Sequence, residues 1–206
     1  MPVKLYWAPH TRALRVLWLL EEAGIAYERE LVDIRTGGQD TPEFRAINPM
    51  GKVPALTDGA ARIAESGAIC AYVADKVPQA RLAPAPGDPA RGRYLQYLFF
   101  SAGCMEPAFV QKMMGVNLPK SSAGWGSFDL AMEVVDAALK PGPYLLGEQF
   151  TAADVMLGSD LWFGIGLLKV IAPTPAMSAY VERLTTRPAF LRAKEIEAAA
   201  LAGAAG

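Results

Sequence analysis

The hydrophobic and polar positions follow two different patterns along the chain. Before residue 78, short β-type runs alternate with helical periodicity, which predicts a strand at 3–7, an apolar helix that Gly24 ends, and a second strand at 27–34. A turn-rich stretch and a short helix at 42–47 follow. Beyond residue 90 almost every segment has helical periodicity. The pattern therefore predicts an α/β part followed by an all-helical part.

The most informative segment is 48–72. Two β-type runs, 53–57 and 62–64, flank Asp58-Gly59, which favours a hairpin turn because glycine adopts positive φ freely. Glu65 and Ser66 then open a third helix. A serine at a helix start leaves N–H groups and the positive end of the helix dipole available to an anion, and the carboxylate beside it accepts from an ammonium group. The pair is a candidate receptor for a zwitterionic α-amino acid.

Pro54 stands near the start of the first of these runs. Proline cannot donate to a sheet ladder, so it belongs at an edge or in a special conformation. A cis Val53–Pro54 bond would turn the Val53 backbone outward, where a peptide ligand could pair with it. The same residues are compatible with an ordinary hairpin followed by a serine-capped helix.

The segment 78–90 has four prolines and one glycine, a composition typical of a linker. We expect domains at 1–77 and 90–206, joined by a linker at 78–89. In the second domain, helices are predicted at 91–114, 128–139, from 152 towards 168, at 176–185 and at 188–200. Thr151 and Asp154 have the spacing of a capping box at one of these helix starts.

Composition narrows the classes of function. A net charge of −1 over 206 residues favours neither a nucleic acid nor an anionic membrane as partner. With one histidine and two cysteines, Cys70 and Cys104, no metal site is expected, and both thiols are predicted to pack on apolar helices. No secretory signal or membrane span is predicted. Two thiols cannot form a disulfide framework at this length, so we expect a cytoplasmic protein.

The motif N-P-x-G-K-V-P-A-L, the D-G turn and E-S-x-A-I-x-x-Y together resemble the glutathione-binding half of cytosolic glutathione S-transferases. The stretches K-L-Y-W-A-P-x-T-R-A-L-R-V-L-W-L-L-E-E, F-T-A-A-D-V-M-L and R-P-A-F extend the resemblance over the whole chain. It implies a thioredoxin-like α/β N-terminal domain followed by an all-α C-terminal domain. It also implies a homodimer that uses glutathione as co-substrate against a small hydrophobic electrophile.

The resemblance implies roles for individual residues. The Val53 backbone, beside Pro54, would pair with glutathione, and Glu65 and Ser66 would hold its γ-glutamyl end. Lys52 and Gln39 match positions that reach the glycine carboxylate. The electrophile pocket would lie on the long helix after the linker, where the candidates are Tyr97, Phe100 and Cys104, with Tyr94 and Trp162 as further possibilities.

Two hydroxyls are candidates for activating the glutathione thiol. The family divides between a tyrosine at the end of the first strand and a serine near the start of the first helix, and this chain offers Tyr6 and Thr11. We favour Thr11, because helix N–H groups and the helix dipole would add to its own hydrogen bond. A plain helix cap at Thr11, a packed aromatic at Tyr6 and a backbone donor remain open. His10, next to Thr11, is expected in an exposed loop.

Three classes of activity follow. The first is conjugation of glutathione to an electrophile, with glutathione-dependent isomerisation or peroxide reduction as related reactions. The second is a non-catalytic glutathione-binding module of the same fold. Disulfide exchange of the glutaredoxin type is disfavoured, because the loop A-P-H-T after the first strand has no cysteine to form the mixed disulfide.

Overall fold

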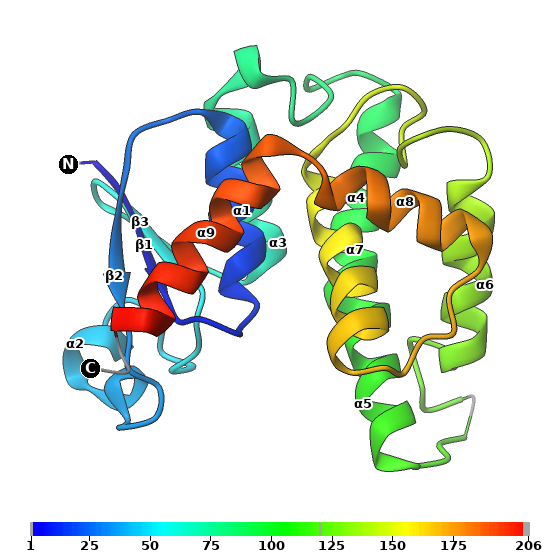
Figure 1. The fold of residues 1–206 in the computed structure, drawn as a ribbon, viewed down its shortest axis with the longest axis horizontal. Helices are drawn as coiled ribbons and strands as arrows, with labels where there is room; N and C mark the ends of the chain where they lie inside the picture. The colour runs from blue at the N-terminus through cyan, green and yellow to red at the C-terminus, as the bar shows by residue number, and fades with distance from the viewer. Residues whose placement is uncertain (1, 120, 204–206) are drawn as a thin grey trace. The chain divides into compact units, whose positions relative to one another are not determined.

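A computed structural model describes residues 2–119 and 121–203. The chain divides into two compact units: the first holds the described residues up to Ala80 together with those from Arg187 onward, and the second runs from Arg81 to Thr186. The first unit contains the sheet and the second is built from helices (Figure 1). The predicted fold class, an α/β thioredoxin-like domain followed by an all-α domain, is confirmed.

The first unit is built around a four-stranded sheet in the order β2-β1-β3-β4, in which β1 and β2 are parallel and the other pairs antiparallel. Its elements are β1 (Val3–Trp7), α1 (Ala13–Ala23), β2 (Tyr27–Leu31), a 3-10 turn (Gly38–Asp40), α2 (Pro42–Arg45), β3 (Ala55–Asp58), β4 (Ala61–Ala64), α3 (Ser66–Lys76), a second 3-10 turn (Pro78–Ala80) and α9 (Pro188–Gly203). Strand β1 lies inside the sheet, so both of its edges are paired with neighbouring strands.

Two strand ends differ from the predicted ones. Strand β2 ends at Leu31 and not at residue 34, because the Asp33 carboxylate accepts from the Arg35 N–H at 3.0 Å and turns the chain. Strand β3 begins at Ala55 and not at residue 53, because Pro54 has no N–H to donate to the ladder. The segment before β3 is thereby left outside the sheet.

The side chains of β1 alternate between the two faces of the sheet. Leu5 and Trp7 are buried on the face that α1 and α3 cover (Figure 1). Tyr6 points to the opposite face, where it packs with Val32 and with Phe44 of α2. The end of β1 is therefore held from both sides.

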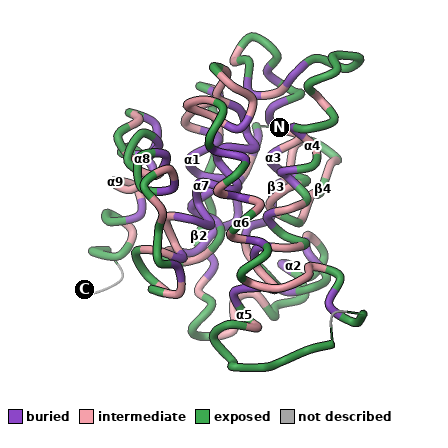
Figure 2. The backbone as a smooth tube through the Cα atoms, turned by 90° about the vertical axis from the view of Figure 1, so that its right-hand side faces the viewer, coloured by how far each residue is buried: buried purple, intermediate pink, exposed green. Residues whose placement is uncertain are grey.

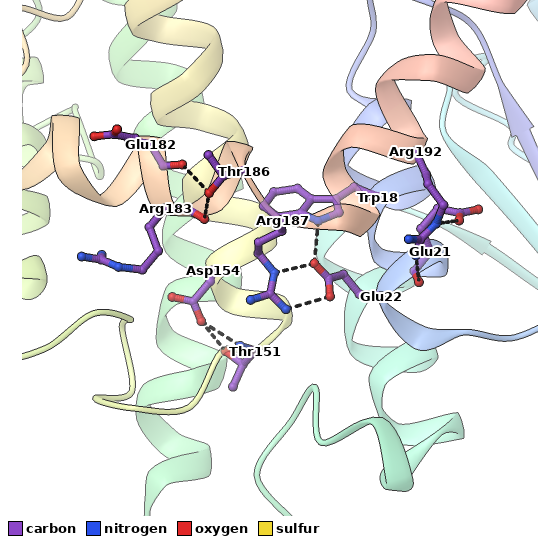
Figure 3. A network of polar contacts seen from close by, with 10 residues as sticks. All are labelled: Trp18, Glu21, Glu22, Thr151, Asp154, Glu182, Arg183, Thr186, Arg187 and Arg192. Carbon is purple, nitrogen blue, oxygen red and sulfur yellow. Dashed lines mark hydrogen bonds and ion pairs between the residues drawn. The ribbon is translucent and has the colours of Figure 1, made fainter.

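Helix α9 packs along α1. The Arg187 guanidinium pairs with the Glu22 carboxylate through two contacts of 2.6 and 2.8 Å, and Arg192 pairs with Glu21 at 2.9 Å (Figure 3). The Trp18 and Phe190 rings meet edge to face at 5.1 Å. The sequence grouped residues 188–200 with the helical domain, whereas these contacts place α9 in the first unit. The sequence-based boundaries at 1–77, 78–89 and 90–206 stay a prediction.

The second unit consists of α4 (Ala90–Phe100), a π-helical turn (Ser101–Met105), α5 (Glu106–Met114), α6 (Phe128–Leu139), α7 (Ala152–Trp162), a second π turn (Phe163–Leu167) and α8 (Pro175–Thr185). Helix α7 is buried along nearly its whole length (Figure 2). The single helix predicted at 91–114 is interrupted by the first π turn. Pro107 lacks the N–H that would continue the ladder there. The Ser101 hydroxyl, at the start of this turn, donates to the buried Asp160 carboxylate.

The second half of the proline-rich segment is attached to the second unit. The Leu82 carbonyl accepts from the Ala152 N–H at 2.8 Å, and the Arg91 guanidinium donates to the Pro84 carbonyl at 2.7 Å. Leu82 itself is buried. The residues from Arg81 onward are therefore packed onto the helices that follow them.

The predicted capping box forms at the start of α7, and both of its residues are fully buried. The Asp154 carboxylate accepts four hydrogen bonds: from the Thr151 N–H (2.8 Å) and hydroxyl (3.1 Å), the Leu145 N–H (2.9 Å) and the Tyr180 hydroxyl (2.9 Å). Burial raises the pKa of Asp154, and the hydrogen bonds oppose that rise. The carboxylate thus joins α7, the preceding loop and α8.

We expect Asp154→Ala to destabilise the protein more than Thr151→Ala. Loss of a helix cap costs about 0.5–2 kcal/mol. Removal of Asp154 additionally leaves buried donors unsatisfied, each at roughly 1–3 kcal/mol. Thermal unfolding followed by circular dichroism measures both. Asp129→Ala, which removes an exposed carboxylate in the first turn of α6, is the control and should hardly change the melting temperature. Equal melting temperatures for the Asp154 and Asp129 variants would contradict this prediction.

Candidate functional site

Three segments of the first unit meet at one end of the sheet. Tyr6 near the end of β1 pairs with Ala55 at the start of β3, and Ala55 pairs with Ala64 at the end of β4. Because neighbouring strands are about 4.8 Å apart, the residues just beyond these pairs are also neighbours. The β1–α1 loop, Val53-Pro54 and Glu65-Ser66 are therefore brought together, although they lie up to about sixty residues apart in the chain.

Glu65 and Ser66 form the junction between β4 and α3. Glu65 has φ 68° and ψ 119°, a conformation that costs a residue with a side chain of order 1–3 kcal/mol. Its carbonyl accepts from the Ile69 N–H at 2.9 Å, so the helix begins immediately after it. Within residues 2–119 and 121–203, neither the Glu65 carboxylate nor the Ser66 hydroxyl makes a hydrogen bond or an ion pair. Both groups remain available at the N-terminus of α3.

The loop before β3 is organised by Asn48, which is buried. Its amide nitrogen donates to the Lys52 carbonyl at 2.7 Å, and its amide oxygen accepts from the Met50 N–H at 3.1 Å. The Val53–Pro54 peptide bond is cis. Among the residues that the structure describes, the Val53 backbone groups and the exposed Lys52 ammonium have no hydrogen-bond or ion-pair partner. Sequence analysis assigned no role to Asn48, although the N-P-x-G turn signal contains it.

Gln39 lies against this loop. A Cβ added at Gly51, which has φ 61°, would stand 3.0 Å from the Gln39 carbonyl oxygen. The Gln39 side-chain nitrogen donates to Asp40 at 3.1 Å, whereas its buried oxygen has no partner in the described chain. The structure therefore brings together the segments that carry Gln39 and Lys52, the two candidates for binding the glycine carboxylate.

Thr11 lies at the start of α1, with its hydroxyl already in use. That hydroxyl donates to the Ala8 carbonyl at 2.6 Å and accepts from the Ala13 N–H at 3.2 Å. The Thr11 backbone N–H donates to no acceptor in the described part of the chain. His10 is exposed, as expected, and has φ 57°. Thr11 thus lies one residue before the N-cap Arg12, accepts from the first helical N–H through its hydroxyl oxygen, and leaves its own backbone donor at the helix N-terminus.

Tyr6 has a different environment. Its ring packs edge to face on Phe44 at 6.0 Å and is nine-tenths buried. It lines a cavity of about 250 Å³ together with Val32, which follows β2, and with Thr41 and Ile47, which flank α2. Its hydroxyl makes no hydrogen bond to any residue described by the structure. The ring therefore points beneath α2.

The electrophile-pocket candidates all belong to the second unit. Tyr97 and Phe100 are on α4 with ring centroids 6.3 Å apart, and Cys104 is in the π turn that follows. Burial raises the pKa of Cys104, which is half-buried. In the first unit, burial raises the pKa of Cys70 to about 12, an effect that the nearby Arg15 charge opposes. Cys70 is therefore protonated at neutral pH.

Two further features of the described residues concern metal ions and membranes. No group of three or more histidine, cysteine, aspartate or glutamate side chains within them could hold a metal ion. No helix among them is long and apolar enough to cross a membrane.

Comparison with known proteins identifies the family. The models for the glutathione S-transferase N-terminal and C-terminal domains match residues 1–75 and 119–183. The chain is 30% identical over 207 residues to the disulfide-bond oxidoreductase YfcG of Escherichia coli, a match that covers 91% of this chain and 92% of that protein. The chain belongs to the glutathione S-transferase family.

Two further glutathione S-transferases support this membership. Glutathione S-transferase 3 of Zea mays is 29% identical over 203 residues, covering 92% of this chain and 91% of its own. A family member from Pseudomonas fluorescens, crystallised with two glutathione molecules bound, superposes with a TM-score of 0.80 at 29% identity over 93% of this chain and 92% of that one. The chain is thus a glutathione transferase enzyme by descent, and the Pseudomonas relative binds glutathione.

We expect Gly51→Ala to destabilise the glutathione S-transferase fold more than Gly59→Ala does. Both glycines have φ near +60°, so both variants carry the same cost of about 1–2 kcal/mol for an L-residue in that region. Only at Gly51 would the new methyl also press on a backbone atom, since nothing lies within 4 Å at Gly59. Melting temperatures of the two variants measure the difference. Equal melting temperatures would show that the contact between the Gln39 segment and the Lys52 loop is loose.

Proposed function

We propose that this glutathione S-transferase binds glutathione at the end of the sheet described above and activates its thiol for attack on a hydrophobic electrophile. One observation carries the proposal. Lys52, Val53, Glu65 and Ser66 keep polar groups without partners in the described chain, and the strand register gathers them at one end of the sheet. Groups of both charge signs gathered beside a helix N-terminus are complementary to a ligand that carries both an ammonium group and carboxylates.

The free groups match the two charged ends of glutathione. Glu65 would accept from the γ-glutamyl ammonium, while the Ser66 hydroxyl and the N-terminus of α3 would donate to the neighbouring carboxylate. The Val53 backbone would pair with the cysteinyl residue as an added strand does. The Lys52 ammonium, with Gln39, would hold the glycine carboxylate.

The thiolate would lie at the N-terminus of α1. A thiol with a pKa of about 8.5 must lose about two units to be mostly ionised at pH 7, which requires roughly 2.7 kcal/mol. We assign this stabilisation to Thr11, whose backbone N–H has no partner among the described residues and whose hydroxyl would rotate from the Ala8 carbonyl to the sulfur. Tyr6 is the second candidate. A hydrophobic electrophile would then be held by Tyr97, Phe100 and Cys104.

We predict that Ser66→Ala and Glu65→Ala each weaken glutathione binding about tenfold or more, because a charge-assisted hydrogen bond worth roughly 1.5–3 kcal/mol is lost. Isothermal titration calorimetry measures the affinity. Glu195→Ala, which removes an exposed carboxylate on α9, is the matched control and should bind as the wild type does. Wild-type affinity in both site variants would refute the assignment of this site.

Three variants identify the donor to the thiolate. We predict that Thr11→Val raises the pKa of the bound thiol by about one unit and slows conjugation about tenfold at neutral pH, whereas Thr11→Ser changes neither. Tyr6→Phe should leave both unchanged. The absorbance of the bound thiolate as a function of pH gives the pKa. A raised pKa in Tyr6→Phe alone would reverse the assignment, and no change in any variant would assign the thiolate to backbone N–H groups.

A second candidate reaction is reduction of a disulfide by glutathione. It is favoured by the likeness to the disulfide-bond oxidoreductase YfcG and by the two glutathione molecules in the Pseudomonas relative. The bound thiolate would attack one sulfur of the disulfide and expel the other as a thiolate, and a second glutathione would release the first as glutathione disulfide. Rates with a low-molecular-weight disulfide and with an aromatic halide compare the two reactions.

The buried Cys70 takes no part in either of these proposed reactions.

Peroxide reduction, isomerisation and a non-catalytic binding role remain alternatives to conjugation. A homodimer remains a prediction from the family resemblance, and a cytoplasmic location remains a prediction from the cysteine content.

A further inference from the structure

We propose that Glu197, on the last helix of the chain, is a positioning residue for the activation of the glutathione thiol. It would hold the β1–α1 loop in the conformation that presents Thr11 to the sulfur. This inference rests on the proposed function, since it concerns the same thiolate. It adds a residue from the opposite end of the chain that neither the motifs nor the spacing of the sequence indicated.

The contact is a single hydrogen bond between distant parts of the chain. The His10 backbone N–H donates to the Glu197 Oε1 atom at 2.9 Å, across 187 positions of sequence. His10 has φ 57°, in the left-handed region that residues with side chains rarely adopt. A charge-assisted hydrogen bond to the N–H of that residue stabilises the conformation. Thr11 follows directly, so the position of its N–H and hydroxyl depends on His10.

Glu197 is only 2% exposed, and a buried carboxylate persists only where it has partners. One oxygen accepts from His10, and the other pairs with the Lys194 ammonium one turn earlier on α9. Both oxygens are thus used within the first unit. A carboxylate that served only solubility would lie on the exposed side of the helix, as Glu195 does.

Helix α9 is itself fixed, which gives Glu197 a defined position. The Arg187–Glu22 pair (Figure 3) attaches the beginning of α9 to α1. The Trp18–Phe190 ring contact adds to this attachment. From Arg187 to Glu197 the helix rises about 15 Å along its axis. These contacts therefore anchor the beginning of α9 near the end of α1, and Glu197 reaches the loop at the start of α1.

Four variants of the full-length protein test the role. Glu197→Met keeps the size of the side chain without an acceptor, and Glu197→Gln keeps an acceptor without the charge. Arg192→Ala removes an attachment of α9 that does not touch the loop, and Glu195→Ala removes an exposed carboxylate. Each is characterised by its melting temperature, its glutathione affinity, the pKa of the bound thiol, and kcat and KM for conjugation.

We expect Glu197→Met to raise the pKa of the bound thiol by about half a unit or more and to lower kcat at neutral pH about threefold or more, with glutathione affinity nearly unchanged. Glu197→Gln should keep the pKa of the bound thiol and kcat close to their wild-type values. Arg192→Ala should lower the melting temperature but not change the pKa or kcat. The inference is overturned if Glu197→Met changes the pKa and kcat no more than Arg192→Ala, or if the Gln variant is as impaired as the Met variant.

Amide hydrogen exchange of the wild-type protein, measured by NMR, provides a second test. It requires no glutathione and no variant, so it also applies if Glu197→Met does not fold. In the wild-type protein the His10 amide should exchange much more slowly than the Thr11 amide, which has no acceptor within the described residues. Equal exchange rates would refute the positioning role. If glutathione fails to bind the wild type while His10 is protected, the proposed function is wrong and the hydrogen bond between His10 and Glu197 remains established.

Discussion

The burial of helix α1 on nearly all sides is the constraint on which the first unit depends. Nine of its eleven residues are buried, including every position from Ala13 to Leu20. One sheet face and α3 cannot enclose a helix that is buried on nearly all sides, so a further element must cover it. Helix α9 does so, with two ion pairs and an aromatic contact along the interface. The return of the chain to the first unit follows from this requirement.

The same packing positions the strand ends and the loop that form the candidate site. Sheet register gathers the ends of β1 and β4 and the start of β3, and α9 holds the loop that follows β1. At that end of the sheet, charged and polar groups of Lys52, Glu65 and Ser66 remain without partners in the described chain. Because Cys70 is buried and protonated, it offers no reactive thiol at this end of the sheet.

In the second unit, hydrogen bonds to buried carboxylates join the helices and a loop to one another. Asp154 accepts four hydrogen bonds from three different parts of that unit, and Asp160 accepts from Ser101 beside the π turn that interrupts the long helix. Both carboxylates are on α7, the most deeply buried helix of the unit. Both carboxylates are used in structural contacts. The aromatic residues of α4 therefore remain the candidates for substrate binding in the second unit.

The sequence by itself determined the fold class, the D-G hairpin, the capping box and the candidate residues at Lys52, Val53, Glu65 and Ser66. These features depend on neighbours within a few positions, or on an ordered motif, and both are visible in the residues alone. Only the tertiary structure decided that Tyr6 points beneath α2, that the Thr11 hydroxyl is engaged with Ala8, and that α9 packs on α1. It also revealed Glu197. Contacts such as His10–Glu197, 187 positions apart, leave no periodic signal, because the fold and not the spacing brings them together.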